Sequence, residues 1–283
     1  MSVMRARMAF AMNAPALRSG AVAPVDGTWV PADLGAQYNS HWTADDHGTA
    51  NMTDDGAGVI SSWKARSTAI NKTAVTTARP TWGAAAFNSS YAGVTFAGAL
   101  TVLGTATGVA GMPTGSATGY IFVVADQTAL VADTGQRYFG SYGSASASAG
   151  RSVLRTVTGG VNRLQISTGT ATPLNDTSVD LSGPHMILAG FDSTTLYGWI
   201  DGTVTTPATI ASSPLATATT RTRLGADAGT TSTLFHKGGI RHWMILSGTL
   251  SAANVDKLFG WAAWDSGLRS LLPAGHPYKS VRP

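Results

Sequence analysis

The residues best suited to chemistry in this chain are its carboxylates, and all fifteen of them are aspartates. Two adjacent pairs, Asp45 with Asp46 and Asp54 with Asp55, lie close together in the sequence. Hydrolysis of a glycosidic bond needs two carboxyl groups that flank the bond. Neighbouring residues on a strand point to opposite faces, so neither aspartate pair suits this reaction. Oxygen ligands clustered in a turn suit Ca²⁺ better. The four aspartates therefore predict either a calcium loop or a solvated loop in which aspartate shapes the turns.

Other kinds of reaction chemistry have no matching residue pattern. The chain has no cysteine, which excludes disulfides, thiolate nucleophiles and cysteine metal sites. It has no glutamate, which excludes a His-Glu-x-x-His zinc protease, and it has neither a Gly-x-Ser-x-Gly elbow nor a Walker-type phosphate loop. The six histidines lack regular metal spacing, so we interpret them as local hydrogen-bonding or packing residues. We expect no enzymatic activity and no cofactor apart from the possible calcium ion.

Aromatic side chains offer a different chemistry, because their faces stack on the apolar surfaces of sugar rings. Tyr197 and Trp199 share one face of an alternating segment. Tyr138 and Tyr142 precede a Ser/Ala/Gly-rich stretch, where exposure is expected. These four residues predict a carbohydrate contact. For Tyr197 and Trp199 the alternative is packing in the core between two sheets.

The elements that must position these residues are mostly strands. Residues 185–202 alternate with period two on both sides of a turn at Asp192, which predicts a β-hairpin. Residues 120–125 form an apolar run that predicts a buried strand, and residues 151–158 and 163–167 alternate again. After Ser251, a candidate N-cap, the period lengthens, and one apolar helix face is lined by Val255, Leu258, Phe259 and Ala262. The patterns predict an all-β fold with one C-terminal helix.

Composition limits the partners of this fold. Charged residues make up 12% of the chain, which is about half of the usual share. Their positive excess lies in the two tails, residues 1–20 and 266–283, and no basic stripe with interleaved aromatics predicts a nucleic-acid surface. The chain also lacks an apolar run of about 18 residues, so we expect no membrane insertion. The uncharged polar surface suits repetitive assembly or sugar contact.

The hairpin and several other segments resemble the concanavalin A-like jelly roll of the laminin-G and pentraxin type. Residues 221–226 and 239–246 resemble its late strand pair, and its opening segment is matched by residues 41–47, 54–56 and 59–63. Ala97 stands where this family often has an aspartate, which argues against a metal or sugar role for that turn. The resemblance implies an antiparallel two-sheet jelly-roll sandwich over residues 34–283. Glucanases of this fold typically use a Glu-x-Asp-x-x-Glu strand, which this chain cannot form.

The two ends of the chain carry the remaining expectations. Residues 250–283 resemble the helix and Leu-Pro-Ala-Gly-His-Pro-Tyr tail of versions of this domain in tailed-phage virion proteins. Residues 1–33 are interrupted by proline and glycine, so we interpret them as an extended N-terminal arm. The resemblance implies that the arm docks on other virion proteins. The alternative is a frayed terminus.

Together with these patterns, the resemblance implies a virion structural and adhesion protein, such as a head spike, a fibre or a tail-tip component. We expect it to lie on the surface of a virion or phage-like particle, to be oligomeric there, and to contact host cell-surface polysaccharide through a lectin-like domain. The alternative function is a capsid decoration or assembly subunit that binds only protein neighbours.

Overall fold

The computed structural model describes the larger part of the chain, namely residues 28–67, 71–74, 78–98, 101–105, 112–113, 115, 117–127, 137–143, 150–158, 161–168, 174–176, 178–209, 221–226 and 235–283. Residues 1–27 of the predicted arm lie outside the described residues.

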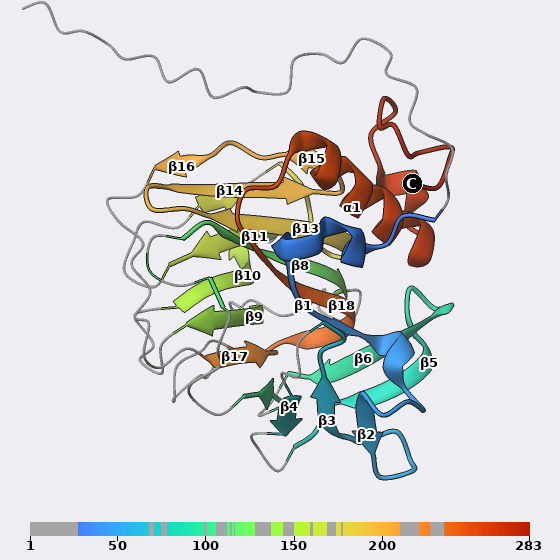
Figure 1. Ribbon diagram of the computed structural model, residues 1–283. Helices are drawn as coiled ribbons and strands as arrows, with labels where there is room; N and C mark the ends of the chain where they lie inside the picture. The colour runs from blue at the N-terminus through green and yellow to red at the C-terminus, as the bar shows by residue number, and fades with distance from the viewer. Residues whose placement is uncertain are drawn as a thin grey trace, which may run out of the picture.

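Two nine-stranded antiparallel sheets form the body of the protein (Figure 1). Sheet A has the order β15-β14-β13-β8-β18-β6-β5, with β1 paired to β18 and β16 paired to β14. Sheet B has the order β12-β11-β10-β9-β17-β7-β4-β3-β2. The predicted all-β jelly-roll sandwich with one C-terminal helix is confirmed.

The strands of sheet A are β1 (Tyr38–Thr43), β5 (Thr81–Phe87), β6 (Tyr91–Ala97), β8 (Gly119–Asp126), β13 (Pro184–Phe191), β14 (Thr195–Ile200), β15 (Thr203–Val204), β16 (Ala208–Thr209) and β18 (Lys237–Ser247). The strands of sheet B are β2 (Met52–Asp54), β3 (Ile60–Lys64), β4 (Asn71–Ala74), β7 (Leu103–Gly104), β9 (Arg137–Gly143), β10 (Gly150–Thr158), β11 (Val161–Ser167), β12 (Leu174–Asp176) and β17 (Arg221–Leu224). The helices are α1 (Ala252–Asp265) and the 3-10 helices Pro31–Gln37, Ala44–Asp46 and Arg269–Leu271.

The predicted hairpin at residues 185–202 is present as β13 and β14, with Ile187 opposite Ile200 and Phe191 opposite Leu196. Strand β8, which contains the predicted apolar run, pairs with β13 along its whole length. The turn after β14 is closed by Asp201, whose backbone has a φ of 54° and whose carboxylate accepts a hydrogen bond from the Met186 N–H at 3.0 Å. The alternation in the sequence thus gives the correct strands and the correct turns.

Strand β18 comes from the end of the chain and lies in the middle of sheet A (Figure 1). One of its edges pairs with β8. Its other edge pairs with β6 along residues 237–240 and with β1 along residues 242–246. Segments from both ends of the chain therefore meet in one sheet.

A hydrophobic core fills the space between the two sheets. Three of its indoles, Trp42, Trp63 and Trp243, are completely buried. Trp42 Nε1 donates to the Trp63 carbonyl at 2.9 Å, and Trp63 Nε1 donates to the Thr43 carbonyl at 3.2 Å. Because these N–H groups are paired, two of the large aromatic rings are buried without an unsatisfied donor.

Helix α1 covers the outer face of sheet A and makes a third layer. Ser251 caps it as predicted, because its hydroxyl accepts a hydrogen bond from the Asn254 N–H at 3.1 Å. The buried helix residues include the predicted apolar face, and they pack on the outward side chains of β8, β13 and β18, as the second hydrophobic cluster shows. Among the described residues, no helix has both the length and the apolar character that a bilayer crossing requires.

The first described residues pack against the last ones. Trp29 is buried in the cluster below α1, and its N–H donates to the Pro283 carbonyl at 3.3 Å. The 3-10 helix Pro31–Gln37 spans the boundary that the sequence places between residues 33 and 34. The chain thus enters the folded domain beside its C-terminal tail.

Lys72 on β4 is a completely buried cation in the core between the sheets. Its Nζ donates to Thr222 Oγ1 at 2.6 Å and lies 4.2 Å from the centre of the Trp42 ring. Burial lowers the pKa of Lys72 well below its ordinary value. The site therefore favours the neutral amine. At neutral pH the unfolded Lys72 is protonated, so folding must either release this proton or bury the charge, and either step lowers the free energy of unfolding.

Replacing Lys72 by methionine is expected to raise the free energy of unfolding at pH 7 by about 1–3 kcal/mol, because the apolar chain keeps the volume without the charge. The gain should shrink as the pH rises towards 10, where the unfolded lysine also loses its proton. Urea denaturation at several pH values measures it. Lys64→Met, at an exposed position of β3, is the control with an expected change below about 0.5 kcal/mol. A less stable Lys72→Met protein would contradict this prediction.

Candidate functional site

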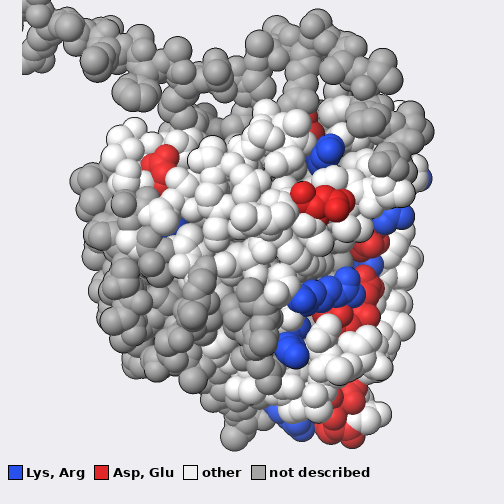
Figure 2. Space-filling view, in the orientation of Figure 1, with Lys and Arg blue, Asp and Glu red and all other residues white. Residues whose placement is uncertain are grey.

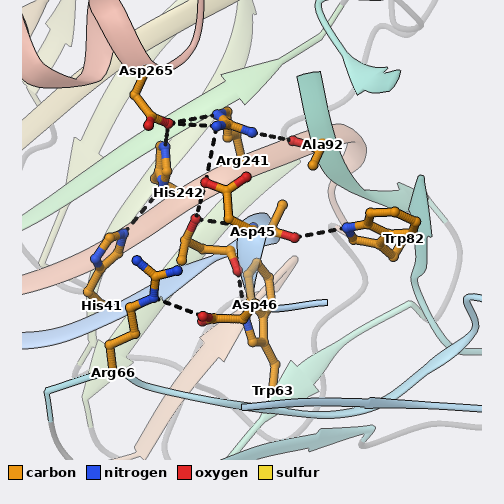
Figure 3. A network of polar contacts seen from close by, with 12 residues as sticks. His41, Asp45, Asp46, Trp63, Arg66, Trp82, Ala92, Arg241, His242 and Asp265 are labelled. Carbon is orange, nitrogen blue, oxygen red and sulfur yellow. Dashed lines mark hydrogen bonds and ion pairs between the residues drawn. The ribbon is translucent and has the colours of Figure 1, made fainter. Parts of the chain in front are cut away.

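The first predicted pair of aspartates lies on the 3-10 turn Ala44–Asp46, which sends the two side chains apart (Figure 3). Asp45 Oδ2 accepts from Arg241 Nη2 at 3.1 Å. Asp46 is buried, and its Oδ1 accepts from Arg66 Nε at 2.8 Å. Each carboxylate therefore has a different arginine as its partner.

The second pair also separates. Asp54 Oδ2 lies 2.6 Å from His47 Nε2, and the Gly56 N–H together with His47 lowers the pKa of Asp54. Asp55 Oδ1 accepts the Ala57 and Val59 N–H groups at 3.1 Å, and its Oδ2 lies 3.2 Å from Arg79. These contacts are those of aspartates that shape turns and form ion pairs.

One group of three possible metal ligands occurs among the described residues, and it is not the predicted one. Ligand atoms of Asp45, His242 and Asp265 lie within 4.8 Å of one another. Arg241 Nη2 lies among them, 2.6 Å from Asp265 Oδ2 and 3.1 Å from Asp45 Oδ2 (Figure 3). Because a fixed guanidinium already supplies the positive charge, this group does not fit a calcium ion.

The same group continues into a buried chain of hydrogen bonds that sequence reasoning missed. His242 Nε2 lies 2.8 Å from Asp265 Oδ2, and His242 Nδ1 lies 3.3 Å from His41 Nε2. His41 Nδ1 in turn lies 2.9 Å from the Tyr38 hydroxyl. The chain joins β1, β18 and α1, and the Trp261 ring packs on both imidazoles. Local hydrogen bonding was the expected role of these histidines, but nothing in the sequence pairs residues this far apart.

Burial is a main influence on the pKa values of the residues in this hydrogen-bond network. It lowers the pKa of His41 well below its ordinary value, and the neighbouring His242 and Arg66 act in the same direction. Burial also lowers the pKa of His242, against the opposing effect of Asp265. For Asp265 burial opposes ionisation, yet His242 and Arg241 together hold its pKa well below the usual range. These shifts favour neutral His41 and His242 and an ionised Asp265 in the hydrogen-bond network.

The predicted pair Tyr197 and Trp199 lies on the outer face of sheet A. Trp199 is opposite Leu188, which belongs to the cluster below α1, so the alternative of a core position between the sheets is wrong. Both side chains are half-buried, and their ring centres are 6.2 Å apart with 30° between the planes. Beyond Trp199, the edge residue Val204 is 46% exposed. The pair and its edge neighbour form an accessible aromatic surface, here called the β14 platform (Tyr197, Trp199 and Val204).

Two neighbours hold the β14 platform in place. Tyr197 donates its hydroxyl proton to Asp192 Oδ2 at 2.7 Å. The Tyr120 ring lies 6.4 Å from Trp199, centre to centre. It reaches this position because Gly190 lies beside it, where a Cβ would come within 2.8 Å of the Tyr120 ring. A side chain at residue 190 would displace this support.

The structure does not bring Tyr138 and Tyr142 to the platform. Both lie on β9 in sheet B. Tyr142 is completely buried, and its oxygen accepts from Arg151 Nη1 at 3.0 Å. The expectation that Tyr142 is exposed is therefore wrong, because a cross-strand arginine satisfies the phenol inside the sandwich. Tyr138 is half-buried.

Charges are unevenly distributed on the face drawn in Figure 2. Lysine, arginine and aspartate side chains gather on its right-hand side, from the level of α1 downwards, whereas most of the other described surface in this view is uncharged. This agrees with the low content of charged residues and with the ion pairs of Asp45, Asp46 and Asp265.

Comparison with known proteins identifies the fold. No protein-family model matches the chain, and no curated protein matches it in sequence. The binding domain of botulinum neurotoxin serotype D is similar in structure, with a TM-score of 0.54, 9% identity and coverage of 81% of this chain and 52% of that one. The sialidase of Trypanosoma rangeli in complex with sialic acid gives a TM-score of 0.52 and 9% identity over 79% of this chain and 33% of that one. This chain thus spans between a third and about half of the length of these proteins, and the likeness shows a lectin-like jelly-roll fold.

Proposed function

We propose that the protein is a lectin-like virion surface component that contacts host cell-surface polysaccharide through the β14 platform. The observation that carries this proposal is the half-buried Tyr197 and Trp199 pair beside the fixed Asp192 carboxylate. Such rings offer flat apolar faces to a sugar, and the carboxylate offers an acceptor for its hydroxyl groups. The toxin binding domain of the same fold has also been solved in complex with N-acetylneuraminic acid, which makes a sugar a reasonable first ligand class to test.

The virion setting rests on the ends of the chain. Residues 250–283 resemble the tail of phage virion versions of this domain, and the N-terminal arm is proposed to dock on neighbouring virion proteins. Trp29 meets Pro283 beside α1, so an arm that precedes residue 28 would leave the domain near the C-terminal tail. Locating the protein in an intact particle, at a resolution that traces residues 1–33, tests this part of the proposal.

We further propose that the domain binds without cleaving bonds. Asp45 and Asp265 are the carboxylates whose oxygens approach each other in the group around Arg241. His242 and Arg241 hold the pKa of Asp265 well below its usual range, which favours the ionised form over the protonated acid that a glycosidase pair needs. Release of reducing ends from host polysaccharide by the full chain would contradict this.

Replacing Trp199 by alanine is expected to weaken polysaccharide binding about 30-fold, because it removes a central aromatic anchor. Tyr197→Ala should have a similar effect. The measurement is adsorption of the full chain to host cells with and without capsule, followed by a glycan array. Tyr138→Ala is the control, since Tyr138 lies in the other sheet, and it should leave binding unchanged.

Loss of binding with Tyr138→Ala but not with Trp199→Ala would move the site away from β14. Absence of any sugar binding by the wild-type protein would instead favour a capsid decoration or assembly subunit that binds only protein neighbours. Thermal melting of each variant separates lost contacts from lost folding.

A further inference from the structure

The carboxylate beside the β14 platform is fixed by its own turn. Asp192 Oδ1 accepts the Thr194 N–H at 2.8 Å and the Thr195 N–H at 2.7 Å. Its other oxygen, Oδ2, accepts the Tyr197 hydroxyl at 2.7 Å. Three hydrogen bonds therefore hold the negative charge at one place next to the aromatic rings, and this place does not depend on a ligand.

Asp192 adds negative charge beside the two phenols of this region, Tyr197 and Tyr120. Burial, followed by the hydrogen bond to Asp192, raises the pKa of Tyr197. Burial is also the main cause of the raised pKa of Tyr120, and the charge of Asp192 adds to it. In the part of the chain that the structure describes, Asp192 is the one carboxylate, and no lysine or arginine is found, among the groups that shift the pKa of either phenol. A cation that could receive the carboxylate of an acidic sugar is not among these groups.

From this geometry we infer that the β14 platform takes uncharged glycans and discriminates against sialylated ones. The inference rests on the proposed function and names the ligand class of that same site. A neutral sugar can stack on Trp199 and donate a hydroxyl proton to Asp192 Oδ2. A sialic acid would bring a second carboxylate beside Asp192, and two like charges near a protein surface repel each other. The two neighbours of known structure were solved with sialic acids, so the inference separates this chain from them.

A glycan array on which each neutral oligosaccharide stands beside its α2,3-sialylated form tests the inference with the full chain. The wild-type protein should bind the neutral member of a pair at least about fivefold more strongly. Asp192→Asn removes the charge but retains an oxygen that can accept the Thr194 and Thr195 N–H groups. This variant should still bind the neutral glycans and should lose most of the discrimination against the sialylated ones.

Asp180→Asn is the matched control. Asp180 forms the same kind of turn, since its Oδ1 accepts the Ser182 N–H at 3.1 Å and the Ser182 hydroxyl at 2.6 Å, and it is exposed. The control should change neither the affinity nor the discrimination. The hydrogen bonds of Asp180 among the described residues go to Ser182 and not to the platform, so this variant reports the general effect of removing one negative charge.

The outcomes separate the two proposals. Preferential binding of sialylated glycans by the wild-type protein, or unchanged discrimination in Asp192→Asn, overturns the inference and leaves the sugar-binding proposal in place. Binding to none of the glycans, with the protein shown to be folded by thermal melting, overturns the sugar-binding proposal and the inference with it.

Discussion

Replacing Arg241 by leucine is expected to lower the free energy of unfolding by about 3–5 kcal/mol, which makes it one of the most damaging single substitutions in the chain. Its side chain is only 6% exposed, and its guanidinium bonds to Asp265, Asp45 and the Ala92 carbonyl. Removing it leaves Asp265 ionised in a largely buried place without its main counter-charge. Urea denaturation monitored by tryptophan fluorescence measures the loss.

Arg79→Leu is the control for this prediction. Arg79 pairs with Asp55 at 3.2 Å, but both side chains are about a third exposed, at 34% and 38%. Exposed ion pairs contribute about 0–1 kcal/mol, so this variant should unfold almost like the wild type. Equal effects of the two substitutions would show that burial of Arg241 does not determine its contribution.

Acidification from pH 7 to pH 5 is expected to lower the stability by about 2 kcal/mol for each of His41 and His242 that stays neutral in the folded state. Both pKa values are depressed by folding, whereas an unfolded histidine titrates near pH 6.5. At pH 5 the two histidines therefore bind protons in the unfolded chain but not in the folded one. The stabilising effect is fully present above about pH 6.5 and is lost as the pH falls below it.

The groups around the two imidazoles determine whether folding raises or lowers their pKa values. His41 faces Tyr38, His242 and Arg66, and His242 also faces Asp265, Arg241 and Asp45. Denaturant titrations at several pH values give the proton uptake on unfolding. His41→Gln can retain hydrogen bonds to Tyr38 and His242 without titrating, and it should reduce this uptake by about one proton. A stability that stays constant between pH 7 and pH 5 would contradict the neutral state of the pair.

The sequence predicts the strands whose neighbours are close along the chain. The β13–β14 hairpin, the apolar strand β8 and the capped helix α1 all follow from periodicity, turn residues and one serine, and all are confirmed. These features depend on local backbone preferences and on which face is apolar, and both are visible in a short stretch of sequence.

Features that depend on distant partners could not be predicted in this way. His41 and His242 meet because β1 pairs with β18, and the buried Tyr142 hydroxyl has a partner because Arg151 lies opposite it on the neighbouring strand. The contacts of the aspartate pairs could not be predicted for the same reason, since their carboxylates bind arginines and a histidine from other parts of the chain. Of the predicted sugar-binding residues, Tyr197 and Trp199 lie together, because their alternation within one strand was sufficient to place both on one face.

The central place of β18 has a consequence for how the protein is made. During synthesis β1, β6 and β8 leave the ribosome long before their common neighbour, so sheet A cannot close until residues 237–247 have followed. Until then these strands have unpaired edges, which is the state in which nascent β proteins aggregate. We therefore expect sheet A to fold slowly and only after residue 247 has left the ribosome, and a chain that stops before residue 237 to accumulate as insoluble material.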